Sequence, residues 1–476
     1  MSNYEMVIGI EVHARISTKS KMFCGCSNDF FGKAPNSTVC PICMGFPGVL
    51  PVLNKEALEK GIKAALALHC SIPEKSLFDR KNYFYPDLPK AYQISQWDNP
   101  VSIKGYLDVL VNGEKKRIGI TRLHLEEDAG KLTHVAGGTL CDYNRSGTPL
   151  MEIVSEPDIR SADEAVAYAE ELQKILRYVG SADCDMEKGG MRFDLNISLR
   201  EKGTEKFGTK VEVKNLNSFR SLEKAIHFEF ERQENLISKN EKIIQETRGF
   251  DDVKSITVSQ RTKEEANDYR YFPEPDLPPI YTEKDYVENL KKQLPELPTD
   301  RKERFMKDYS MSEVDARILT DNSDLADFYE KVTKLSKDAK RSCSYITTNM
   351  LALMKVQNIG DIKLIKISVQ NLADLIKKIS SGEINNNIGK QIFEIMFNEG
   401  KNVDQIIKEK GLIDNSSDDN LEKWVKEVIS ENPGPVAQYK SGKISVIAFF
   451  IGKIMAKSQG KANPGKVKEV LERMMN

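Results

Sequence analysis

Strict alternation of apolar and polar residues in two segments predicts β-strands whose two faces differ in chemistry. In residues 6–15 the apolar side consists of Met6, Ile8, Ile10, Val12 and Ala14, and the other side of Gly9, Glu11, His13 and Arg15. In residues 191–199 the apolar side consists of Phe193, Leu195, Ile197 and Leu199, and the other side of Arg192, Asp194, Asn196 and Ser198. Successive side chains of a strand point to opposite faces, so the apolar sides are predicted to join a core. Asp and Asn are poor strand formers, which indicates that the polar face has a function.

Other segments that are expected to be strands carry the same kind of polar face. Residues 210–215 place Glu212 and Lys214 opposite two valines, and acids also occur in residues 125–128 and 151–154. A sheet is the simplest scaffold that gathers such distant residues on one surface. Residues 162–179 have the spacing of a helix that covers the apolar face. We therefore expect an α+β N-terminal domain that presents one ionisable sheet face.

The ligands on that face favour a magnesium site. The candidate catalytic and magnesium-binding residues are Glu11, His13, Glu126, Glu127 and Glu152. Carboxylate oxygens are hard ligands, which Mg²⁺ prefers and most transition metals do not. Magnesium in turn suggests a nucleotide.

The usual phosphate-binding loops are missing. Residues 460–466 match the P-loop only in part, because Val467 stands where a Ser or Thr would bind the metal, and there is no Gly-x-Gly-x-x-Gly sequence. We expect ATP to bind on the sheet through metal ions and basic side chains, which neutralise the phosphoryl charge. The candidate nucleotide-binding residues are Arg192, Asp194, Asn196, Glu212 and Lys214.

Four of the eight cysteines form two close pairs, Cys24 with Cys26 and Cys40 with Cys43. Two such pairs can converge on one tetrahedral ion, which predicts a zinc knuckle over residues 24–43. Four thiolates leave no open coordination position, so the zinc is expected to be structural. The alternative is two disulfides or buried thiols, which a reducing compartment disfavours.

Strand, Gly and Pro patterns change to long helical patterns after residue 295. Pro295 and Pro298 prevent a helix from crossing this boundary. We expect three domains: a catalytic domain over residues 1–295, an all-α helical domain over 296–405, and a small α-helical tail domain over 406–476. Residues 433–476 contain eight Lys and Arg residues and two acidic residues, a net charge of +6. A phosphate backbone fits this tail, and a solvated charged face is the alternative.

Composition limits the remaining function classes. The net charge of −1 excludes a globally basic nucleic-acid binder, although not a locally basic one. The first residues lack the pattern of a signal peptide, and the longest apolar run, 444–451, is far short of the ~20 residues of a membrane span. We expect a cytoplasmic protein that has no membrane partner.

Short motifs spread over the whole chain carry a resemblance to a known family. They lie at residues 9–13, 40–43, 48–54, 83–96, 125–131, 142–147, 152–158, 214–219, 268–276, 432–436 and 462–466. Together they resemble the family of aspartyl/glutamyl-tRNA amidotransferase B subunits.

The resemblance implies a fold and a reaction. The N-terminal domain would be a cradle on a largely antiparallel sheet of the glutamine synthetase type, and the tail would contact tRNA. The activity would be that of a ligase that forms carbon–nitrogen bonds with glutamine as the amido donor. ATP would phosphorylate the side-chain carboxyl of Glu mischarged on tRNA(Gln) or of Asp mischarged on tRNA(Asn), and ammonia would displace the phosphate. The implied partners are the amidase A subunit, which releases the ammonia, and a small C subunit, in a heterotrimer.

The resemblance also implies individual roles. His13, Glu127 and Glu152 match the ligands of one magnesium ion, and Glu11 and Glu126 match residues near a second. Lys90 matches a residue of the ammonia channel.

Two other function classes remain as alternatives. A non-catalytic RNA-binding protein would use the zinc knuckle and the basic tail, but it would leave the acids unexplained. An ATP-dependent ligase that acts on a free amino acid would leave the basic tail without a role.

Overall fold

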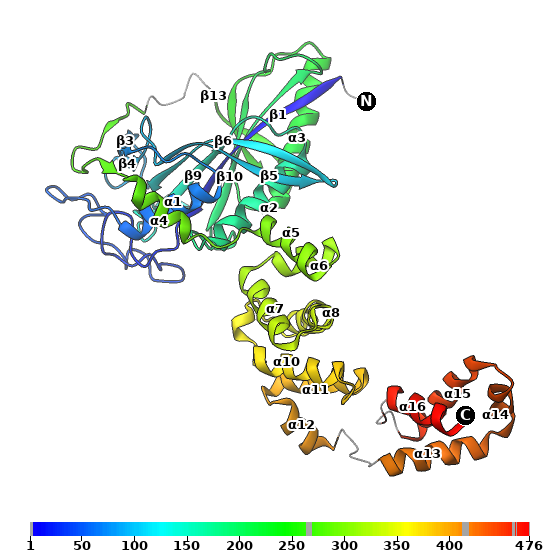
Figure 1. Cartoon of the computed structure of the whole chain (residues 1–476). Coiled ribbons are helices and arrows are strands. Elements are labelled where there is room, and N and C mark those ends of the chain that lie inside the picture. Colours follow the sequence, from blue (N-terminus) through cyan, green and yellow to red (C-terminus); the bar gives the residue numbers. More distant parts are fainter. Residues whose placement is uncertain (1–2, 263–268, 412–417, 459–461, 463, 476) are drawn as a thin grey trace. The chain divides into compact units, whose positions relative to one another are not determined.

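The computed structural model describes residues 3–262, 269–411, 418–458, 462 and 464–475. Residue 268 of the motif 268–276 and residue 463 of the motif 462–466 lie outside the described residues. The chain divides into two compact units, residues 1–297 and 298–476 (Figure 1).

The first unit is built on an eight-stranded sheet in the order β13-β12-β11-β10-β1-β9-β6-β5. The strands are β1 (Tyr4–Arg15), β5 (Ser102–Val111), β6 (Glu114–Glu127), β9 (Pro149–Ser155), β10 (Met191–Glu201), β11 (Val211–Leu216), β12 (Glu246–Asp251) and β13 (Ile256–Thr262). Neighbouring strands are antiparallel except β11 and β12, which are parallel. The sheet together with its helices confirms the predicted α+β class.

Helices cover one face of this sheet. The helices α1 (Lys55–Ala67), α2 (Ala162–Tyr178) and α3 (Phe219–Ser238) share a core with the apolar side of the strands (Figure 1). Ile8, Ile10 and Val12 of β1 are fully buried there, as their alternation predicts. The predicted helix over residues 162–179 is confirmed, and Ser161 caps it by accepting a hydrogen bond from the Glu164 amide. The polar side of the central strands is therefore the face opposite these helices.

Smaller elements surround the end of β6. A three-stranded sheet joins β3 (Asp79–Asn82), β4 (Tyr92–Ser95) and β14 (Phe272–Pro273), while β7 (Lys131–Val135) and β8 (Gly138–Asp142) form a hairpin. A third, two-stranded sheet pairs β2 (Lys75–Ser76) with β15 (Ile280–Tyr281), and α4 (Lys284–Lys292) packs on α1. Because β4 packs against β6, it reaches the acidic end of that strand.

The second unit is helical in its described part. One hydrophobic core joins α5 (Pro298–Tyr309), α6 (Glu313–Thr320), α7 (Ser323–Ser336), α8 (Ala339–Ser344), a π-helix (Tyr345–Met350), α9 (Leu351–Val356), α10 (Val369–Ser380), α11 (Asn386–Glu399) and α12 (Val403–Lys410). A separate core joins α13 (Asp418–Glu431), α14 (Pro433–Lys440), α15 (Ile447–Lys457) and α16 (Pro464–Met475). Two cores support the predicted division of this unit near residue 405, which stays a prediction. Among the described helices, none combines the length and the apolar character that a bilayer span requires.

Candidate active site

Strand register brings the predicted ionisable residues together on the face opposite the helices. His13 of β1 lies opposite Arg192 of β10 and Glu152 of β9. Glu11, which stands two residues before His13 in β1, lies opposite Asp194. The pairing continues outward, because Asn196 lies opposite Glu212 and His124 of β6 lies opposite Glu152. Residues that are far apart in the sequence thus become cross-strand neighbours.

The first group of ligands consists of His13, Glu126 and Glu152. His13 Nε2 lies 3.3 Å from Glu152 Oε2 and 3.7 Å from Glu126 Oε1. His124 Nε2 approaches the same acids, at 3.3 Å from Glu152 and 3.8 Å from Glu126. One ligand atom from each of His13, Glu126 and Glu152 lies within 4.8 Å of the others, so these residues could hold a metal ion.

Electrostatics support a cation at this group. Burial disfavours a charged imidazolium, yet Glu152 and Glu126 raise the pKa of His124 to about 9. Burial also disfavours an ionised carboxylate, but the two histidines hold the pKa of Glu152 well below its usual range. Two buried carboxylates this close require compensating positive charge, which protonated histidine provides here and a divalent cation can provide as well.

The second group consists of Glu11, Asp194 and Glu212, whose ligand atoms also lie within 4.8 Å of one another. Lys214 Nζ lies 3.1 Å from Asp194 and 3.0 Å from Glu212. Burial and the nearby Glu152 raise the pKa of Glu11, which indicates that negative charge accumulates on this face. A cation bound here would relieve that repulsion.

Beside the first group lies a polar cavity of about 340 Å³, and several cations face it. The basic residues in its lining are Lys81, Arg145, Arg192 and Lys214. Arg192 Nη1 lies 3.6 Å from Asp128 Oδ2, and Lys81 is attracted by Glu126 and Glu152. The cavity therefore combines metal-ligating acids with positive charge, the combination that phosphoryl transfer requires.

The neighbouring acids Glu126 and Glu127 have different surroundings. Glu126 accepts a hydrogen bond from Ser95 at 3.1 Å and lies with the first group. Glu127 instead accepts hydrogen bonds from Lys90 Nζ at 2.7 Å and from the Ile94 amide at 2.9 Å. Lys90 and Glu127 line a different cavity, of about 210 Å³, together with Phe23 and Cys43. Alternation along β6 accounts for the difference, because adjacent residues point to opposite faces.

Sequence reasoning missed several residues of this site, among them His124, Lys81 and Arg145. His124 contacts both Glu126 and Glu152, and the signal for it was present, since it stands two residues before Glu126 in the same strand. Lys81 lies on β3, whose sequence gives no hint that the strand reaches the acids.

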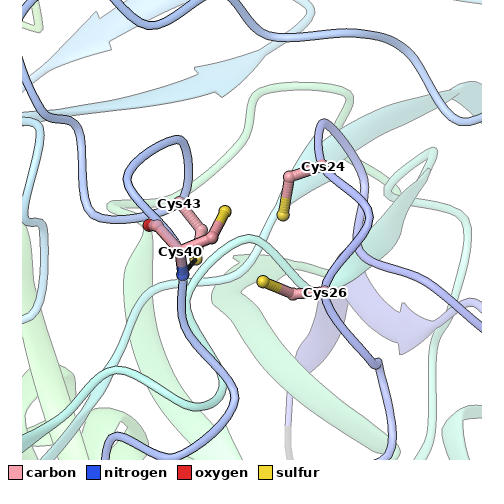
Figure 2. Close-up of side chains that lie close together, drawn as sticks. All are labelled: Cys24, Cys26, Cys40 and Cys43. Carbon is pink, nitrogen blue, oxygen red and sulfur yellow. Dashed lines mark hydrogen bonds between the residues drawn. The ribbon is translucent and has the colours of Figure 1, made fainter.

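The four predicted zinc ligands meet at one point (Figure 2). The sulfur atoms of Cys24, Cys26, Cys40 and Cys43 lie within 4.8 Å of one another, and all four cysteines are free rather than disulfide-bonded. Burial raises the pKa of Cys26 to about 11, whereas a hydrogen bond with Cys24 lowers the pKa of Cys43 to about 4. The cluster could bind a metal, and its donor set of four thiolates is the one that structural zinc prefers.

Comparisons with known proteins place both units in one family. A family model described as the GatB/GatE catalytic domain matches residues 6–288, and one described as the GatB domain matches residues 327–475. The chain is 50% identical over 473 residues to the B subunit of the aspartyl/glutamyl-tRNA(Asn/Gln) amidotransferase of Persephonella marina, a match that covers 99% of each chain. The corresponding B subunits of Caldicellulosiruptor saccharolyticus and Brevibacillus brevis are 49% and 47% identical, over 98% and 100% of each chain.

Proposed function

This chain belongs to the family of aspartyl/glutamyl-tRNA(Asn/Gln) amidotransferase B subunits, and we propose that its ionisable sheet face carries out the ATP-dependent amidation of a tRNA-bound amino acid. The substrate is Glu on tRNA(Gln), Asp on tRNA(Asn), or both. The single observation that carries the proposal is the pair of acidic groups next to Arg192 and Lys214 on one sheet face.

The reaction has two steps. A side-chain carboxylate oxygen of the aminoacyl-tRNA attacks the γ-phosphorus of ATP, and the bond to ADP breaks, which leaves an acyl phosphate. The nitrogen of ammonia then attacks the acyl carbon, and the carbon–oxygen bond breaks with release of inorganic phosphate, which takes up a proton. The first step is needed because an oxide ion is a far poorer leaving group than phosphate.

The side chains of this face would have different roles. His13, Glu126 and Glu152 would hold one divalent ion, and Glu11, Asp194 and Glu212 would hold a second. Bound Mg²⁺ supplies Lewis-acid neutralisation of the phosphoryl oxygens. Arg192 and Lys214 add fixed positive charge, and burial of the site strengthens each of these interactions because water screens them less.

Ammonia is proposed to arrive on the other side of β6. Lys90 and Glu127 line the cavity of about 210 Å³ there, and Glu127 is the direct neighbour of Glu126. A glutaminase partner, the amidase A subunit, would release the ammonia, and a small C subunit would complete the heterotrimer. Cys43 also lines this cavity, so a zinc ion at the four cysteines would stabilise one of its walls.

The sheet as a whole and the C-terminal helices are proposed to bind the tRNA substrate. The eight-stranded sheet would be a cradle of the glutamine synthetase type, and the helices after residue 405 a tail domain that binds tRNA. Positive charge on residues 433–476 supports a contact with the phosphate backbone.

Release of inorganic phosphate by the reconstituted complex tests the function. We expect release only when ATP, Mg²⁺, mischarged tRNA and glutamine as the ammonia source are present together, with amidated aminoacyl-tRNA as the product. Release with free glutamate instead would favour a small-molecule ligase, and no release under any of these conditions would favour an RNA-binding protein.

Two neighbouring variants test which acid binds the ion. The resemblance assigns Glu127 to magnesium, whereas the contacts favour Glu126. We expect Glu126→Gln to raise the Mg²⁺ concentration for half-maximal rate by about 10-fold or more, because removal of a ligand weakens metal affinity. Glu127→Gln is expected to lower the rate through the loss of its Lys90 contact and to leave that concentration within about twofold.

The two variants control for each other, since both remove one buried carboxylate charge at adjacent positions. If Glu127→Gln shifts the Mg²⁺ dependence and Glu126→Gln does not, the assignment from the resemblance holds instead.

A further inference from the structure

Lys21, which lies in the connection between β1 and α1, has a fully buried side chain. Its Nζ contacts Cys43 Sγ at 3.6 Å and the Tyr143 carbonyl oxygen at 3.5 Å, and it forms no ion pair with a carboxylate among the described residues. A lysine is rarely buried unless an opposite charge compensates its ammonium group. The contacts of Lys21 therefore require a source of negative charge other than a carboxylate.

Main-chain hydrogen bonds fix the position of Lys21 beside the cysteines. Its amide donates to the Cys26 carbonyl oxygen at 2.9 Å, and its carbonyl oxygen accepts from Asn54 Nδ2 at 3.2 Å. Asn54 is also the N-cap of α1, and the amide of the next residue, Met22, donates to the Gly147 carbonyl oxygen at 2.8 Å. The first unit thus holds Lys21 between the cysteine loops, α1 and the turn before β9.

The nearby carboxylate of Glu127 already has a partner of its own. A Cβ placed on Gly147 would lie 3.5 Å from Lys21 Cδ and 3.8 Å from Glu127 Oε2, so both side chains border this glycine. Lys90 Nζ, however, lies 2.6 Å from Glu127 Oε1 and supplies the positive charge for this carboxylate. The Cys43 sulfur is therefore the source of negative charge that Lys21 itself contacts.

Metal binding changes what the Cys43 sulfur offers to Lys21. A thiol is only a weak hydrogen-bond acceptor, so four thiols would leave the buried ammonium group without compensation. Metal binding requires thiolates, and four thiolates around one divalent ion retain a net negative charge. The buried Lys21 therefore fits the metal-bound form of the cluster.

We propose that Lys21 is the counter-cation of the zinc cluster: its ammonium group donates a hydrogen bond to the Cys43 sulfur and offsets the negative charge of the metal-bound thiolates. Lys21 is a positioning residue rather than a ligand, because an ammonium group has no lone pair to offer to the ion. Its effect is to raise the zinc affinity of the four cysteines. This role does not depend on the amidation reaction, so it can be measured on the full chain without tRNA or ATP.

Lys21→Met removes the charge and keeps an unbranched side chain. We expect the Kd of the full chain for Zn²⁺, measured by competition with a chromogenic chelator, to rise by about 10-fold or more, the usual cost of losing an outer partner of a metal ligand. Lys21→Gln is a second neutral variant, for which a change in the same direction is expected. An unchanged Kd in both variants would overturn the proposal.

Lys116→Met is the matched control for the zinc affinity. Lys116 is a partly buried lysine of the same unit, and it pairs with Glu164 instead of a cysteine. Its substitution should leave the Kd for Zn²⁺ within about twofold, as expected of a site that shares no partner with the cluster.

The melting temperature separates an effect of charge from an effect of packing. With zinc bound, we expect Lys21→Met to lower the melting temperature, because the weakened site contributes less binding free energy to folding. After zinc is removed with a chelator, we expect the substitution to leave the melting temperature unchanged or to raise it, because an apolar side chain then replaces an uncompensated buried charge. An equal loss with and without zinc would mean that Lys21 only packs, and it would overturn the proposal.

A spectroscopic signature tests the contact with the sulfur itself. In the full chain loaded with Co²⁺ in place of zinc, we expect the thiolate-to-cobalt charge-transfer band at longer wavelength in Lys21→Met than in Lys116→Met. The reason is that a sulfur without a hydrogen-bond donor releases electron density to the metal more easily. A band at the same wavelength in both variants would overturn the proposed hydrogen bond to Cys43.

Discussion

Replacing Glu152 by Gln is expected to lower the rate of amidation by roughly 10²–10³-fold, the usual cost of removing one preorganised electrostatic group from an active site. Glu152 is the acid that both His13 and His124 approach most closely, at 3.3 Å each. The amide of Gln has nearly the same shape but no charge. The substitution therefore removes the main counter-charge of two buried imidazoles and one ligand of the proposed metal ion.

Phosphate release and amidated tRNA are both measured, at several Mg²⁺ concentrations. High Mg²⁺ should restore part of the rate, since a weakened site still fills at higher concentration. Glu201→Gln is the control, because Glu201 is an exposed acid at the end of β10, a strand of the same sheet. A Glu152→Gln rate within about threefold of that of the unaltered complex would show that the group of His13, Glu126 and Glu152 is not the reaction centre.

Replacing Cys43 by Ser is expected to remove the bound zinc and to destabilise the first unit by about 3 kcal/mol or more. The binding free energy of a structural zinc ion is also folding free energy, so loss of a ligand lowers both. Cys43 is the buried member of the cluster, and its Sγ accepts a hydrogen bond from the Cys40 amide at 3.2 Å. For a unit of this size such a loss shifts the melting temperature by roughly 6–12 °C.

Metal content by elemental analysis and thermal unfolding check this result together. Cys141→Ser is the matched control, since Cys141 is partly exposed and lies outside the cluster. We expect about one zinc per chain in the unaltered protein and in Cys141→Ser, and little in Cys43→Ser. Unchanged metal content and melting temperature in Cys43→Ser would mean that the four thiols only pack against each other.

Alternation in the sequence was enough to predict both faces of β1 and β10. Ile10 and Val12 are buried, while Glu11 and His13 lie on the face opposite the helices, as the period of two requires. The same rule places His124 on one face with Glu126. In residues 114–127, however, charged residues at the start of the strand obscure the pattern.

The convergence of the four cysteines could likewise be predicted from their spacing alone. Two close pairs of thiols typically bind one metal ion in a protein from a reducing compartment, where disulfides are rare. The cavity lined by Lys90 and Glu127 could not be predicted from the sequence. Lys90 lies in the connection before β4 and reaches Glu127 only through the packing of β4 on β6.

By itself, the sequence determined the fold class, the strands that carry the acids, the cysteine cluster and the family. Each of these features depends on local periodicity or on short motifs, which can be recognised without the tertiary structure. Only the tertiary structure decided which acids become neighbours. Cross-strand register pairs His13 with Glu152 and Glu11 with Asp194. The physical reason is that register depends on the order and offset of strands that are distant in the chain, and a local pattern does not encode them.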